Sequence, residues 1–105
     1  MDTLKRLEQT IAARAKAAPS ESYVASLNAK GLPKIAQKIG EEATEAVIAA
    51  LAGTAEDLTA ESADLLFHLL VLLEHKGVAF QQVLDELERR EGVSGLDEKA
   101  GRVAE

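Results

Sequence analysis

Two short acidic runs are the part of this sequence best suited to chemistry. The first is Glu41-Glu42-x-x-Glu45 and the second is Glu61-x-x-Asp64. Carboxylates three residues apart lie on one face of a helix, so each run can present oxygen ligands together. Both runs lie in apolar surroundings, where an unpaired carboxylate is costly to desolvate. Several acids that converge there need a positive partner, and the pattern predicts a divalent cation.

The residue types narrow the choice of metal. Hard oxygen ligands favour Mg²⁺, with Mn²⁺ as the second choice. The chain has no cysteine, which excludes zinc-thiolate sites, disulfides and thiol catalysis. A di-iron bundle would need Glu-x-x-His runs, and neither His68 nor His75 follows a glutamate at that spacing. The expected metal ligands are Glu42, Glu45, Glu61 and Asp64.

The first acidic run falls on a predicted long helix that begins near Pro33 and ends at about Ala52. At about 100° per residue, Glu42 and Glu45 border the apolar stripe of this helix and do not face bulk water squarely. Gly40 costs a helix interior roughly 1 kcal/mol relative to alanine. It indicates either a close approach by another helix or a ligand, or a glycine that is simply tolerated. The predicted apolar stripe consists of Ile35, Ile39, Ala43, Ala46, Val47 and Ala50.

The second acidic run falls on a second long helix. Thr54 and Asp57 form a capping-box pattern at its start, and it runs to about Lys76. Between Leu65 and Leu73 the helix is apolar nearly all round, which predicts burial on more than one side. Because the connection is short, the acids of the two helices can face each other in an antiparallel pair. The exception to the apolar surface is a polar seam made of Asp57, Glu61, Asp64, His68 and His75.

The remaining pattern predicts an all-α fold, a helical bundle of about four to five helices forming a single domain over residues 1–105. Two prolines, three aromatic residues and few β-branched runs favour helices over strands. Shorter helices are expected before Pro19, from about Tyr23 to Gly31, and from Ala79 to Arg90, with a further short one after Ser94. At 105 residues, pairing with a second subunit would help to complete the core, so we expect a homodimer.

Charge and hydropathy limit the partners and the location. A net charge of −6 argues against binding to nucleic acid, which needs a basic surface. A phosphorylated small molecule remains compatible, provided that a metal bridges the charges. No apolar run is long enough to span a bilayer, and the beginning of the chain does not resemble a signal peptide. We therefore expect a cytoplasmic protein without a membrane partner.

Two basic residues and two histidines leave alternatives open. Lys34 and Lys38 precede Glu42 by two turns and one turn, and could contact phosphate oxygens. They could equally form surface pairs with neighbouring glutamates. His68 could orient a carboxylate or a substrate group, or be a hydrogen-bonded interior histidine. His75, near the end of its helix, would complement the negative end of the helix dipole.

Longer stretches of the sequence carry a resemblance. KIAQKIGEEATEAVIAA, followed by ESADLLFHLLVLL, resembles the phosphoribosyl-ATP pyrophosphatases of histidine biosynthesis. SYVASL at 22–27 and GVSGLDEKAGR at 92–102 extend this match. The wider pattern ExxE…ExxD is similar to all-α NTP pyrophosphatases, including MazG-like proteins and dimeric dUTPases. Thr44, Phe67 and Gly101 depart from the family pattern, but none of them is an acidic position.

The resemblance implies Mg²⁺-dependent hydrolysis of 1-(5-phosphoribosyl)-ATP to phosphoribosyl-AMP and pyrophosphate. It implies the four ligands named above, with Glu41 as a further acid nearby, and Glu41 or Glu45 as the general base. Two alternatives are a MazG-like house-cleaning nucleotide pyrophosphatase and a non-catalytic helical dimerisation module. The residues expected to hold phosphates or touch substrate are Lys34, Lys38, Lys99, Arg102, Ser22 and Tyr23.

Overall fold

A computed structural model describes residues 2–91, and every regular element in this range is an α-helix. The predicted all-α class, with four to five helices, is confirmed. The short helix expected after Ser94 lies outside the described residues. The helices are α1 (Asp2–Arg14), α2 (Tyr23–Lys30), α3 (Leu32–Ala52), α4 (Ala55–His75) and α5 (Phe80–Arg90).

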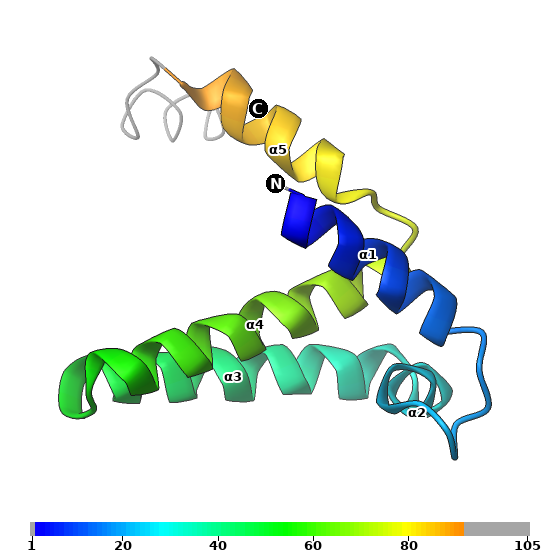
Figure 1. Cartoon of the computed structure of the whole chain (residues 1–105), viewed down its shortest axis with the longest axis horizontal. Coiled ribbons are helices and arrows are strands. Elements are labelled where there is room, and N and C mark those ends of the chain that lie inside the picture. The colour runs from blue at the N-terminus through cyan, green and yellow to red at the C-terminus, as the bar shows by residue number, and fades with distance from the viewer. Residues whose placement is uncertain (1, 92–105) are drawn as a thin grey trace.

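Helices α3 and α4 form a long antiparallel hairpin, with α1 and α2 gathered at the end where α3 begins and α4 ends (Figure 1). At the other end the chain reverses through Gly53 and Thr54. The Thr54 side chain accepts a hydrogen bond from the Asp57 amide at 3.1 Å, and the Asp57 carboxylate accepts one from the Thr54 amide at 3.0 Å. A cap of this kind contributes about 1 kcal/mol. It fixes where α4 starts, and hence its register against α3.

Helix α2 is set across the hairpin by its two ends. The Ser22 hydroxyl oxygen caps its start by accepting from the Ala25 amide at 3.1 Å. Gly31 ends it with a φ of +93°, a conformation that side-chain-bearing residues rarely adopt. Because α3 begins at Leu32, this one glycine turns the chain directly from α2 into α3. In Figure 1, α2 is seen end-on while α3 lies across the view.

The apolar core lies at this same end of the hairpin. Each large aliphatic side chain that is fully buried there stabilises the fold by roughly 1.5–3 kcal/mol. The core therefore anchors α1 and α2 to the beginning of α3 and the end of α4. Its buried members are Ile11, Val24, Leu27, Ile35, Leu70 and Val71.

No helix between residues 2 and 91 covers the outer half of the hairpin, and part of the predicted apolar stripe of α3 is wrong. Val47 and Ala50 are exposed, whereas Ala49 is buried. The face of α3 that is buried passes through Ile35, Glu42 and Ala49, each two helical turns after the last. Packing against α4 selects this line, which places Glu42 within the buried face. Exposed large apolar side chains on the outer half are Val47, Ile48, Leu51, Leu58 and Leu66.

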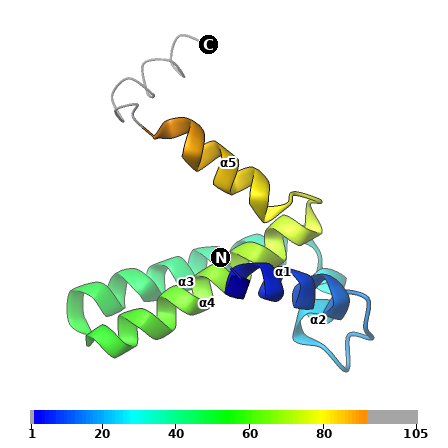
Figure 2. The same cartoon turned by 45° about the horizontal axis from the view of Figure 1, so that its top comes forward.

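Helix α5 extends away from the hairpin in both views (Figure 2). Its first amide, that of Phe80, donates a hydrogen bond of 2.8 Å to the Glu8 carboxylate on α1. This contact fixes the start of α5, while Leu87 further along is 55% exposed. In residues 2–91, no helix combines the length and apolar character needed to cross a bilayer.

Candidate metal centre

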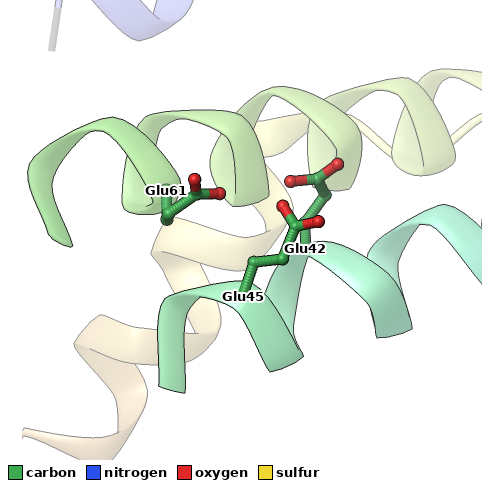
Figure 3. A group of neighbouring side chains, drawn as sticks. All are labelled: Glu42, Glu45 and Glu61. Atoms are coloured by element: carbon green, nitrogen blue, oxygen red, sulfur yellow. The ribbon is translucent and has the colours of Figure 1, made fainter. Parts of the chain in front are cut away.

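Three of the predicted ligands converge between the two long helices. Glu42 and Glu45, one turn apart on α3, point toward Glu61 on α4 (Figure 3). Each offers a carboxylate oxygen, and these oxygens lie within 4.8 Å of one another. Oxygens bound at 2.0–2.1 Å on opposite sides of Mg²⁺ would be about 4 Å apart. A small adjustment of flexible glutamate side chains would therefore let the three share one cation.

The burial of two of these carboxylates supports a cation site. Glu42 is only 6% exposed. One oxygen of Glu42, Oε2, and one of Glu61, also Oε2, are buried without a hydrogen-bond partner among residues 2–91. Buried polar atoms are nearly always hydrogen-bonded, and two negative groups in this condition side by side are unusual. A bound cation supplies what both oxygens lack, so the donor set fits Mg²⁺ or Mn²⁺.

Lys38 neutralises the other side of Glu42. Its ammonium lies 3.4 Å from Glu42 Oε1 and 3.9 Å from Glu41 Oε2. Desolvation acts to lower the pKa of Lys38, but Tyr23, Glu42 and Glu41 outweigh it and the pKa is raised. Lys38 therefore stays charged at neutral pH. It engages one oxygen of Glu42 and leaves the other toward the acid cluster.

The remaining predicted acids lie beside the cluster and outside it. Glu41 accepts a hydrogen bond from Gln37 at 3.2 Å and forms the longer ion pair with Lys38. Asp64, one turn after Glu61, is exposed, and the group that the structure brings together does not include it. Its role as a fourth ligand stays a prediction.

Tyr23 and His68 form a hydrogen-bonded pair next to the acids. The Tyr23 hydroxyl lies 2.8 Å from His68 Nε2. Burial raises the pKa of Tyr23, with smaller contributions from Glu42, Glu41 and Asp64, while the charge of Lys38 acts in the opposite direction. The hydroxyl thus lies within the field of the cluster. The sequence leaves open whether His68 orients a site group or is an interior histidine. Its hydrogen-bond partner, Tyr23, is 45 residues away, and no local sequence pattern indicates such a pair.

The other predicted substrate residues have varied positions. Ser22 caps α2, so its oxygen has a structural role while its hydroxyl proton stays available. Lys34 is partly buried in the first turn of α3. Lys99 and Arg102 lie outside the described residues. Among the described residues, neither Ser22 nor Lys34 forms a hydrogen bond or ion pair with the acid cluster.

A pocket opens from the cluster toward the turn of the hairpin. Glu45 and Glu61 line the end nearest the site, and Ile48 and Ala52 provide an apolar wall. Its volume is about 300 Å³. The carboxylates therefore border a space large enough to admit part of a small molecule.

Fold and site together define a class of protein. It is an all-α protein whose two long helices hold a cluster of carboxylates beside an open pocket. The sequence pattern of the family described as phosphoribosyl-ATP pyrophosphohydrolase matches residues 4–91. The chain belongs to this family of hydrolases. The resemblance drawn from the acidic stretches, and the expectation of an enzyme, are confirmed.

Individual relatives agree. The chain is 70% identical over 102 residues to a phosphoribosyl-ATP pyrophosphatase of Erythrobacter litoralis, covering 97% of this chain and 98% of that protein. It is 67% identical to one of Rhizorhabdus wittichii, covering 95% and 94% of the two chains. With one of Zymomonas mobilis the identity is 56%, over 96% and 94%. The similarity therefore extends over nearly the whole length of each protein.

Proposed function

We propose that this protein hydrolyses 1-(5-phosphoribosyl)-ATP to phosphoribosyl-AMP and pyrophosphate, the second step of histidine biosynthesis, with Mg²⁺ as its cofactor. The observation that carries the proposal is the convergence of Glu42, Glu45 and Glu61 around two buried oxygens without partners. Membership of the family supplies the substrate. The acid cluster alone would suit any polyphosphate that binds with a divalent cation.

Glu42, Glu45 and Glu61 would hold the metal, and Asp64 would join them through a change of rotamer. When bound, Mg²⁺ neutralises polyphosphate charge and polarises the phosphorus–oxygen bonds, a role that Mn²⁺ could also fill. An exposed Glu45 between the buried acids and the pocket suits a site that also admits substrate oxygens. Magnesium commonly shares its coordination between protein carboxylates, water and phosphates.

Other side chains would bind phosphates and move the proton. Water attacks phosphorus, the bond to the oxygen bridging the α and β phosphates breaks, and pyrophosphate leaves. Glu45 or Glu41 accepts the proton of the attacking water. Lys38, already charged beside Glu42, offsets the negative charge that develops on the phosphate oxygens. Further contacts to substrate are proposed for Lys34, Ser22, Tyr23, Lys99 and Arg102.

A second copy of the chain would cover the outer half of the hairpin, giving a homodimer. Leu51 there is 82% exposed. Val47 and Ile48 on α3 and Leu58 on α4 are also exposed. Large apolar side chains exposed on neighbouring helix ends favour an interaction site there. Leu51→Glu should convert a dimer into monomers in light scattering after size exclusion. Ala18→Glu, at an exposed position near the other end of the hairpin, is the control.

The test of the activity is pyrophosphate release from phosphoribosyl-ATP, compared with release from ATP and other nucleoside triphosphates. Hydrolysis of phosphoribosyl-ATP that requires Mg²⁺ and is lost in Glu42→Gln supports the proposal. Hydrolysis of ordinary triphosphates instead would favour a house-cleaning enzyme. Absence of any hydrolysis, with the dimer intact, would favour a helical dimerisation module. Activity unchanged in EDTA would overturn the metal mechanism.

A further inference from the structure

His68 on α4 uses both nitrogens of its ring. Nδ1 lies 2.7 Å from the main-chain oxygen of Asp64, and Nε2 lies 2.8 Å from the Tyr23 hydroxyl. A carbonyl oxygen can only accept, so Nδ1 carries the proton and donates it. In the neutral ring Nε2 is then an acceptor, and the Tyr23 hydroxyl donates to it. The main chain of α4 thus sets the direction of the Tyr23 hydrogen bond.

Packing holds the two rings in this arrangement. His68 is 6% exposed and lies edge-on to Phe67, with ring centres 5.2 Å apart, and to Tyr23, with centres 5.7 Å apart. Edge-to-face contacts of this kind are favourable for aromatic rings. Tyr23 itself is 49% exposed. The bond to His68 is therefore what fixes the hydroxyl of a side chain that solvent could otherwise reorient.

The fixed hydroxyl lies beside the acid cluster and offers it only lone pairs. His68, to which the hydroxyl is hydrogen-bonded, is itself held by the main chain of Asp64, one helical turn after Glu61, and this places the phenol oxygen at the α4 side of the proposed site. Since its proton is committed to His68, this oxygen repels carboxylate and phosphate oxygens. It attracts hydrogen-bond donors.

We propose that His68 is a positioning residue that holds Tyr23 as a hydrogen-bond acceptor for a neutral donor of the substrate, such as a sugar hydroxyl, and not for its phosphates. This inference rests on the proposed function. It assigns His68 a role through Tyr23 and specifies which part of the substrate Tyr23 contacts. A fully ionised phosphate oxygen has no proton to give to Tyr23.

The test is a double-mutant cycle with Tyr23→Phe, His68→Leu and the double variant. Each single change should raise KM for phosphoribosyl-ATP about tenfold, with kcat of the same order, because one binding hydrogen bond is lost. The double variant should be no worse than either single variant, since the two residues act as one unit. His68→Gln, which can present an acceptor oxygen to Tyr23, should recover part of the loss.

Magnesium pyrophosphate, whose oxygens are acceptors, gives the second readout. Its inhibition constant should be unchanged in Tyr23→Phe, whereas a parallel weakening would show that Tyr23 binds phosphate and would overturn the assignment. His75→Leu is the matched control. It removes another histidine bond between α4 and α2, to Asn28 at 3.1 Å, outside the site, and should leave KM and kcat unchanged.

Other results of these experiments would also contradict the proposal. Additive effects in the cycle, or a fall in kcat at constant KM in both single variants, would indicate a merely structural role. Nitrogen NMR of the wild type showing a proton on Nε2 of His68 would remove the acceptor. If the wild-type protein does not hydrolyse phosphoribosyl-ATP, the proposed function is wrong. Failure of the positioning role, in contrast, would be seen only in the variants of an active protein.

Discussion

Glu42 on α3 and Glu61 on α4 face each other across the hairpin, each with a buried carboxylate oxygen that accepts no hydrogen bond from the described part of the chain (Figure 3). Two like charges placed in this way oppose folding unless a cation lies between them. Without a cation, the acid cluster therefore lowers the stability of the fold. This relationship can be measured in the protein without substrate.

Replacing Glu61 by glutamine should stabilise the metal-free protein while it removes activity. Glutamine keeps the size of the side chain and removes one of the facing charges. We expect a gain of about 1 kcal/mol, a rise of roughly 4 °C in Tm, for a chain of this length. Thermal denaturation in EDTA measures it, with the exposed Glu88→Gln as control. A lower Tm for Glu61→Gln would show that the charge is already satisfied.

Magnesium should stabilise the wild-type protein in proportion to its binding. At a Mg²⁺ concentration one hundred times Kd, the expected gain is about 2.7 kcal/mol. The rise in Tm should be nearly absent in Glu61→Gln and in Glu42→Gln. Scans across a Mg²⁺ series provide the measurement. An equal rise in all three proteins would place the metal elsewhere.

Lys38→Met should weaken the metal-free protein by about 1 kcal/mol, because Glu42 then loses the ammonium that lies 3.4 Å from its Oε1. The loss should shrink when Mg²⁺ is added, since the cation offsets the same carboxylate. Lys38→Arg keeps the charge and should be close to wild type in stability. Lys5→Met, on the exposed surface of α1, is the control in the same thermal scans. A loss independent of Mg²⁺ would separate Lys38 from the metal site.

Alanine at two glycines should act in opposite directions. No described residue has an atom within 4 Å of where a Cβ on Gly40 would be, so Gly40→Ala should stabilise α3 by 0.5–1 kcal/mol, about the helix-propensity difference. At Gly53 a Cβ would lie 2.9 Å from the Asp57 carboxylate and 3.0 Å from the Ala49 oxygen, so Gly53→Ala should destabilise. Urea unfolding measures both. If Gly40→Ala instead destabilises the protein or weakens the dimer, a second chain approaches closely there.

Acid should remove a stabilising contact in α5. Hydrogen bonds from Arg89 and Arg90 lower the pKa of Glu86 from 4.5 to about 2. A lowered folded-state pKa means that the contribution is fully present above pH 4.5 and is lost as the pH falls toward 2. The Tm difference between wild type and Glu86→Gln should therefore shrink over that interval. A difference that stays constant would show that the ion pairs do not stabilise the fold.

Much of the fold could be predicted because its signals are local. Pro33 in the first turn of α3, the Thr54–Asp57 capping box and the positive φ of Gly31 depend on residues within one turn of one another. The sequence determines the buried face of α3 less well. Val47 was expected in the core and Ala49 was not, since the periodicity of an alanine-rich helix allows more than one stripe.

The sequence alone determined the all-α class, the two helices that carry the acids, and the family, because residue type and helical spacing encode them. Tertiary structure decided which of the acids meet. The register of α3 against α4 brings Glu61 to Glu42 and Glu45 and leaves Asp64 exposed, although the sequence predicts all four as ligands. It also paired Tyr23 with His68 across two helices. Such contacts depend on how separate helices pack, which no local pattern specifies.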